Sequence, residues 1–169
     1  MRTNRIRTAA AFAWLGLALA SNARAVDLRD WSRKYESASE RYLVLDSFNN
    51  EAVLDKETQL VWRRSALSAT SWVFALQNCY ANGTGGRYGW RLPSFSELLS
   101  LVGTGSVLPT GHPFLNVPAQ AYFWSSTDLY VNHDYAWTKP LLVHAISAKS
   151  KDSANPYLCV RGVGVADRG

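Results

Sequence analysis

The chain contains two cysteines, Cys79 and Cys159, and no other feature constrains its fold as strongly. Cys79 falls on the apolar face of a helix predicted to follow Ser71, because apolar residues recur there at helical spacing. Cys159 falls in a strand predicted over residues 157–161. A bond between them would close a loop of about 80 residues and contribute roughly 4 kcal/mol in the chain-entropy model. It would fasten that helix to the last strand of the unit.

The first 25 residues have the pattern of a secretory signal peptide. Residues 9–20 form an apolar run after three early arginines, and residues 23–25 read Ala-Arg-Ala, which fits a cleavage site. The run is shorter than the roughly 20 residues that span a membrane, so we expect cleavage; a retained anchor or a buried core helix is the alternative. Export to the periplasm, cell surface or medium favours one disulfide, and a reactive thiol beside a histidine is the alternative.

Charge and composition exclude some classes of function. The chain has 18 Lys+Arg against 13 Asp+Glu, but four arginines lie in the predicted signal, which leaves 14 against 13. The sequence pI of about 9.4 is therefore mostly a targeting feature and does not predict nucleic-acid binding. The remaining length fits one domain. The chain's seven Trp, six of them after residue 25, and its eight Tyr either fill a core or line a sugar-binding surface.

Short elements are predicted along the rest of the chain. An amphipathic helix is expected over Asp27–Arg41, and its Trp31 and Tyr35 would need cover from the domain or from a second copy in a homo-oligomer. The polar turn between two hairpin strands carries Asp55 and Glu57, which we expect to be solvated, with a calcium ion as the alternative. The other predicted elements are strands over residues 42–45, 52–54, 60–62, 122–126, 135–143 and 157–161, an irregular loop over 104–121 and a charged turn over 149–155.

The stretch GWRLPSFSELLSLV, residues 89–102, predicts a capped helix. Ser94 and Glu97 have the spacing of a capping box, and Gly103 suits the helix end. Arg91 is expected to bind Glu97 or a main-chain carbonyl. The predicted buried face consists of Phe95, Leu98, Leu99 and Val102.

Six segments in order resemble a bacterial family of domains of unknown function, defined by similarity to the C-terminal domain of the Legionella collagen-like adhesin. They are VLDKETQLVW, SWVFALQNC, GWRLPSFSELLSL, GHPF, YFWSST and YLCVRG. The resemblance covers about residues 41–163, between an N-terminal helical segment, 26–40, and a C-terminal tail, 164–169. It implies an α+β domain of the C-type-lectin-like fold, which formylglycine-generating enzymes share. Such a domain has a small, twisted, mainly antiparallel sheet, two helices, long irregular loops and one disulfide.

The resemblance also implies adhesion and the binding of sulfated or fucosylated polysaccharides. One segment departs from the family pattern, because residues 144–155 replace a tighter turn before the last strand. Ligand contacts in that segment are therefore not carried over. The residues expected to be structural are Trp90, Arg91, Leu92, Pro93, Ser94, Glu97, Trp124 and Ser125.

The sequence lacks the constellations that catalysis needs. Formylglycine-generating enzymes use paired cysteines, which are expected to form the structural disulfide here. The three histidines have no metal-ligand spacing, and His133 and Asp134 would point to opposite faces of a strand. The triplets that bind sugar through calcium in true C-type lectins are absent as well. We therefore expect no enzyme activity, no cofactor and no metal.

Candidate binding residues lie between positions 127 and 151. The expected ligand is a cell-surface or environmental glycan, and a protein partner is the alternative; neither nucleic acid nor a membrane span after signal cleavage is expected. Aromatic and hydrogen-bonding side chains there suit a sugar, and lysines suit an anionic polysaccharide. The candidates are Tyr130, Asn132, His133, Asp134, Tyr135, Lys139, Lys149 and Lys151.

Overall fold

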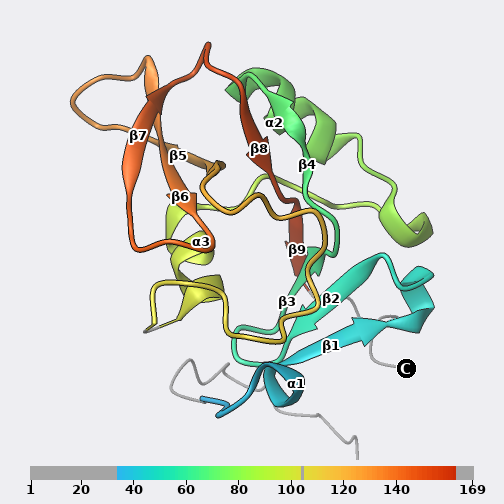
Figure 1. Cartoon of the computed structure of the whole chain (residues 1–169). Helices are drawn as coiled ribbons and strands as arrows, with labels where there is room; N and C mark the ends of the chain where they lie inside the picture. The colour runs from blue at the N-terminus through green and yellow to red at the C-terminus, as the bar shows by residue number, and fades with distance from the viewer. Residues whose placement is uncertain (1–33, 104, 163–169) are drawn as a thin grey trace, which may run out of the picture.

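The computed structural model describes residues 34–103 and 105–162. The predicted signal peptide, the first part of the N-terminal segment and the C-terminal tail lie outside the described residues. The chain has a mixed α+β architecture with antiparallel sheets, and its two main helices are α2, Trp72–Tyr80, and α3, Phe95–Val102 (Figure 1). Shorter helical turns are α1, Ala38–Arg41, η1, Asp46–Phe48, and η2, Thr84–Gly86.

Three antiparallel sheets make up the β structure. The first sheet has the order β1-β2-β3-β9, the second pairs β4 with β8, and the third has the order β5-β6-β7. The strands are β1 Tyr42–Leu45, β2 Ala52–Asp55, β3 Leu60–Arg63, β4 Leu67–Thr70, β5 Tyr122–Asp128, β6 Tyr135–Pro140, β7 Ser147–Ser150, β8 Asn155–Tyr157 and β9 Val160–Gly162. The predicted first strand and the β2–β3 hairpin are confirmed, whereas β4 and β7 were not predicted.

Of the predicted helix over Asp27–Arg41, only residues 38–41 are helical within the described part. Residues 34–37 are not helical, and Ser37 has an extended backbone and accepts a hydrogen bond from the Glu40 amide. A capping box therefore begins a new helix, α1, at Ala38. Residues 27–33 lie outside the described residues.

The acidic turn of the β2–β3 hairpin is not solvated as predicted, because Asp55 is fully buried. The Arg41 guanidinium binds its carboxylate through Nε at 2.9 Å and Nη2 at 2.7 Å. Glu57 adds a second carboxylate, 3.1 Å from Arg41 Nη1. A carboxylate is buried in a protein only when such partners compensate for its lost hydration. Here the main partner, Arg41, comes from α1.

Helix α3 has the predicted capping box between Ser94 and Glu97 and ends at Gly103, in the positive-φ region. Its buried face differs from the prediction, because Leu101 is fully buried and Leu99 is 39% exposed. Leu98, Leu101 and Val102 also follow helical spacing, and the orientation of the helix on the sheets decides which stripe is covered.

The predicted last strand is two strands. Strand β8 ends at Tyr157, β9 begins at Val160, and Cys159 lies in the break between them. This break lets the chain pair first with β4 and then with β3. The predicted disulfide is confirmed, with the Cα atoms of Cys79 and Cys159 5.4 Å apart.

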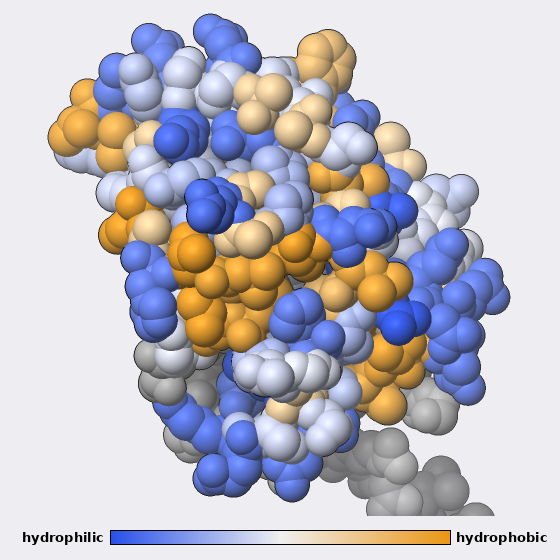
Figure 2. Space-filling view, in the orientation of Figure 1, coloured by the Kyte–Doolittle hydropathy of each residue, from blue (hydrophilic) through white to orange (hydrophobic). Residues whose placement is uncertain are grey.

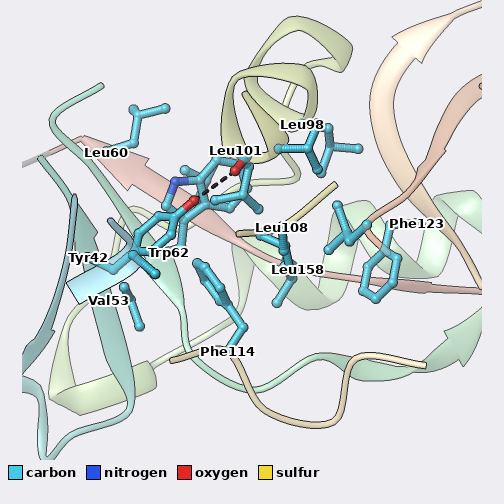
Figure 3. Close-up of a cluster of buried hydrophobic side chains, with 14 residues drawn as sticks. Tyr42, Val53, Leu60, Trp62, Leu98, Leu101, Leu108, Phe114, Phe123 and Leu158 are labelled. Carbon is cyan, nitrogen blue, oxygen red and sulfur yellow. Dashed lines mark hydrogen bonds between the residues drawn. The ribbon is translucent and has the colours of Figure 1, made fainter. Parts of the chain in front are cut away.

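The larger core cluster joins the first sheet to α3 and to the long loop that precedes β5. Figure 3 shows Trp62 of β3, Leu98 and Leu101 of α3, and Phe114 of the loop converging on one apolar interior. Tyr42 of β1 packs edge-on against Phe114, and its hydroxyl donates to the Leu101 carbonyl at 2.7 Å. The predicted irregular loop is thus a structural part of the core.

The same loop reaches the surface on one face. Figure 2 shows apolar surface across the middle of this face, where the loop crosses the molecule in Figure 1. Val117 and Ala121 of the loop, together with Leu142, are partly buried against the core cluster, and Leu115 is 46% exposed. The loop therefore seals the core without a regular element of its own.

Candidate functional site

The loop between β5 and β6, residues 129–134, projects from the third sheet and is held by its own hydrogen bonds. Leu129 donates to the Tyr135 carbonyl at 2.9 Å, and Asn132 donates to the Leu129 carbonyl at 3.0 Å. The Asn132 side chain accepts from the Asp134 amide at 3.0 Å. Tyr130 at the tip is 88% exposed. The loop thus presents an aromatic ring on an ordered turn.

The base of this loop is a small charged cluster around Asp128, the last residue of β5. Lys151 Nζ lies 2.9 Å from one carboxylate oxygen, and His133 Nδ1 lies 3.5 Å from the other. The ammonium of Lys151 lowers the pKa of the Asp128 carboxyl below its usual value. His133 therefore faces Asp128, not its chain neighbour Asp134.

Lys151 is fixed further by the start of α2. Its ammonium lies 4.1 Å from the centre of the Trp72 ring, in a cation–π contact. The Trp72 amide donates to the Lys151 carbonyl at 2.9 Å, and its indole nitrogen donates to the Ser125 carbonyl at 2.8 Å. The Lys151 amide in turn donates to the Asp134 carbonyl at 2.8 Å. The loop, α2 and the turn after β7 therefore form one connected unit.

The other two predicted lysines differ from Lys151 and from each other. Lys149 lies on β7 opposite Ala136 of β6, and its ammonium is 4.3 Å from the centre of the Tyr122 ring. Lys139 is 1% exposed, and its ammonium donates to the carbonyls of residues 106 and 143 at 2.9 and 3.0 Å. Burial lowers the pKa of Lys139. The prediction that Lys139 contacts a ligand at the surface is therefore wrong. Its buried ammonium instead joins the long loop to the segment after β6.

Seven of the eight predicted binding residues lie on or beside the β5–β6 hairpin. We call them the hairpin surface: Tyr130, Asn132, His133, Asp134, Tyr135, Lys149 and Lys151. They combine ring faces, amide and carboxylate groups and two cations. These groups can stack on a ring, donate and accept hydrogen bonds, and pair with an anion.

The residues predicted to be structural support the interior. Trp90, Leu92, Trp124 and Ser125 are buried. The Trp124 indole donates to the Thr70 carbonyl at 2.8 Å, and the Ser125 hydroxyl donates to the Trp137 carbonyl at 2.6 Å. Arg91 binds Glu97 with both terminal nitrogens, at 2.7 and 2.5 Å, and also donates to the Leu92 carbonyl at 3.4 Å.

Sequence reasoning missed two features near the surface. The first is the contact between Trp72 and Lys151, which joins segments 79 positions apart in the chain, so no local pattern indicates it. The second feature is a cleft of about 450 Å³ lined by Tyr80, Ala81, Tyr88 and Gly89. Its two tyrosines flank the glycine-rich segment 83–86 in the sequence. This arrangement was the only sequence pattern that could have indicated the cleft.

Neither a metal centre nor a membrane helix occurs within residues 34–103 and 105–162. No group of three or more His, Cys, Asp or Glu side chains there is placed to hold a metal ion. No helix in this part of the chain has the length and apolar character to cross a membrane.

Comparison with known proteins identifies the family of this chain. No curated protein matches the chain. The model of the Lcl C-terminal domain matches residues 51–161, which include both cysteines, the capped helix and the β5–β6 hairpin. The match spans more than half of the chain, and the chain therefore belongs to the Lcl C-terminal domain family.

Proposed function

We propose that this protein is an exported, non-enzymatic, lectin-like module that binds cell-surface or environmental glycans, sulfated ones included, in adhesion. The observation that carries the proposal is the hairpin surface, where an 88% exposed Tyr130 stands on the ordered β5–β6 loop of the sheet whose strand β7 carries Lys149 and leads to Lys151. Membership of a family of collagen-like adhesin domains supports the same ligand class.

The contacts at this surface suit an anionic sugar chain. The Tyr130 side chain has an apolar ring face and a hydroxyl group. A sugar ring likewise has apolar C–H faces, which can stack on the tyrosine, and hydroxyl groups, which can form hydrogen bonds with it. Lys149 and Lys151 are partly buried on aromatic rings, so their positions are constrained before a ligand arrives. A constrained cation loses less conformational entropy on binding a sulfate group than a free lysine would.

The fold class and the export route belong to the same proposal. A disulfide that joins α2 to the segment before β9 suits an oxidising compartment. The order of hairpin, two helices, long loop and short strands suits the C-type-lectin-like fold. An experimental structure superposed on known C-type-lectin-like domains would test this assignment.

A protein partner is the second candidate, and one observation favours it. Val131, next to Tyr130, is 83% exposed, so the loop tip is apolar as well as aromatic. Exposed apolar tips of this kind are common in protein interfaces. In that case the hairpin surface would insert into a protein groove.

The test is binding of the purified protein, without residues 1–25, to immobilised dextran sulfate and fucoidan across a salt series, with and without a chelator. We expect saturable binding that survives chelation and weakens with salt, because exposed charge pairs are screened. Tyr130→Ala and Asn132→Ala should weaken it, whereas Phe74→Ala, which removes a 58% exposed aromatic ring of α2, serves as the matched control. Absence of binding under all conditions would refute the glycan proposal and favour a protein partner.

A further inference from the structure

The cleft between Tyr80 and Tyr88 is separate from the hairpin surface. Tyr80 is the last residue of α2, and Tyr88 lies after η2, in the segment that leads to the buried Trp90. Their side chains are 83% and 76% exposed, among the most exposed aromatic residues of the described chain. Two exposed aromatic rings that line the same hollow offer faces on which a ligand can stack.

The Tyr80 wall of the cleft is held in place by the disulfide. Cys79, its immediate neighbour, is fully buried and bonded to Cys159. Beyond Tyr80, the amides of Ala81 and Asn82 donate to carbonyls of the last turn of α2, at 2.9 and 3.1 Å. The tyrosine therefore stands on a fixed helix end.

The main chain of the Tyr88 wall is held by hydrogen bonds before and after it in the sequence. Before it, the Arg87 carbonyl accepts from the Trp90 indole at 2.9 Å. After it, the main chains of Arg91 and Val160 exchange two hydrogen bonds of 2.9 Å. The main chains next to the two walls are thus anchored to consecutive residues, Cys159 and Val160, before any ligand binds. Such preorganisation reduces the entropic cost of binding.

The lining of the cleft selects the ligand by its chemistry. No lining residue is charged, so an ionic group would find no partner there. Neither tyrosine hydroxyl has a hydrogen-bond partner within the described residues. Gly89 has φ +84°, and an added Cβ would meet no atom within 4 Å, so the cleft is open beside it. A volume of about 450 Å³ lies in the range of small-molecule sites.

We infer that this cleft is a second glycan site, which takes a neutral pyranose ring with equatorial hydroxyl groups between Tyr80 and Tyr88. Such a ring has C–H groups on its faces, which stack on the tyrosine rings, and hydroxyl groups on its rim, which reach the phenol oxygens and water. The inference rests on the proposed glycan-binding function and adds a neutral ligand class to the anionic one at the hairpin surface.

The test is calorimetric titration of the protein without residues 1–25 with cellotriose and chitotriose, which carry such rings. Tyr80→Ala and Tyr88→Ala should each lower the affinity about tenfold, because stacking contacts are worth about that factor. Tyr88→Phe keeps the ring and should retain most of the affinity. Phe74→Ala is the matched control, since Phe74 is an exposed aromatic residue of α2 outside the cleft.

The outcomes separate this site from the hairpin surface. Binding of dextran sulfate without binding of either trisaccharide would overturn the cleft proposal and leave the proposed function standing. Trisaccharide binding that Tyr80→Ala and Tyr88→Ala each weaken about tenfold, without dextran sulfate binding, would support the cleft and refute the hairpin surface. Trisaccharide affinity unchanged in both alanine variants would overturn the cleft as the site.

Discussion

Asp55 and Asp128 each face a cation from another segment, and the environments of these two carboxylates differ sharply. The Asp55 side chain is fully buried and accepts two hydrogen bonds from Arg41 and one from Thr58. The Asp128 side chain is 40% exposed and faces Lys151, which has a second partner in Trp72. The first cluster lies at the first sheet, and the second lies at the base of the projecting loop.

The difference follows from solvation. A buried carboxylate has lost its water, so its protein partners are the only groups that compensate for the desolvation. An exposed carboxylate keeps part of its water, and salt screens its attraction to the cation. The buried cluster therefore fixes how α1 meets the first sheet, whereas the exposed cluster can change its charge at small cost to the fold.

The largest expected effect comes from breaking the buried cluster with Asp55→Asn. Loss of the negative charge leaves the guanidinium of Arg41 buried with a weaker partner, which costs about 3–5 kcal/mol in comparable buried pairs. Urea unfolding at neutral pH measures the change in the free energy of unfolding. Asp152→Asn, at an exposed acid in the turn after β7, is the control and should leave the midpoint unchanged.

A double variant sharpens this prediction. Arg41→Met combined with Asp55→Asn removes the unpaired charge as well, so its loss should be smaller than the sum of the two single losses. If the loss of stability in the double variant equals the sum of the two single losses, the cost of Asp55→Asn does not come from the uncompensated guanidinium. A loss below about 1 kcal/mol in Asp55→Asn alone would mean that the pair is effectively solvated.

The Arg91–Glu97 pair lies between the two extremes, since the Glu97 side chain is 13% exposed. Burial alone would raise the pKa of Glu97, but hydrogen bonds from Arg91 and Ser94 outweigh it and lower that pKa. The unfolded chain therefore binds a proton at Glu97 more readily than the folded chain. This group stabilises the fold above its unfolded pKa of about 4.3, and the stabilisation is lost as the pH falls through the lower folded pKa.

Glu97→Gln should therefore lower the free energy of unfolding by about 1 kcal/mol at neutral pH, since a capping contact and a charge pair are weakened. Urea unfolding over a series from pH 7 into the acid range gives the comparison, and the gap between the variant and the original should narrow as the pH falls. Glu40→Gln is the matched control, because Glu40 closes the capping box of α1 and is exposed. A gap that persists at low pH would contradict the role of the Glu97 charge.

Sequence reasoning predicted the elements whose causes are local. The capping box of Ser94 and Glu97 spans three residues, and the β2–β3 hairpin needs only two short apolar runs and a turn. The disulfide was predictable because the chain has only two cysteines. Most of the hairpin surface was predictable too, because its residues come from one hairpin and an adjacent strand.

Features that depend on distant segments were not predictable in this way. The burial of Asp55 requires Arg41, and the burial of Lys139 requires a carbonyl 33 residues away. The cleft requires Tyr80 and Tyr88 to be tied to one segment near the C-terminus, through the disulfide and a main-chain bridge. Periodicity carries no information about such meetings, because it describes each element by itself.

The smallest expected effect on stability, at the other end of the comparison, is that of Asp128→Asn. The change in the free energy of unfolding should stay within about 0.5 kcal/mol, because exposed pairs contribute little and the Trp72 ring still holds Lys151. Binding to dextran sulfate should become tighter, although a side chain of the hairpin region has lost its charge. Removal of the carboxylate frees the Lys151 ammonium for a sulfate group, so affinity for dextran sulfate should rise a few-fold at low salt. Asp152→Asn removes the same charge from an exposed acid that forms no ion pair with a lysine among residues 34–103 and 105–162. Affinity that rises equally in both variants would assign the gain to net charge, not to Lys151.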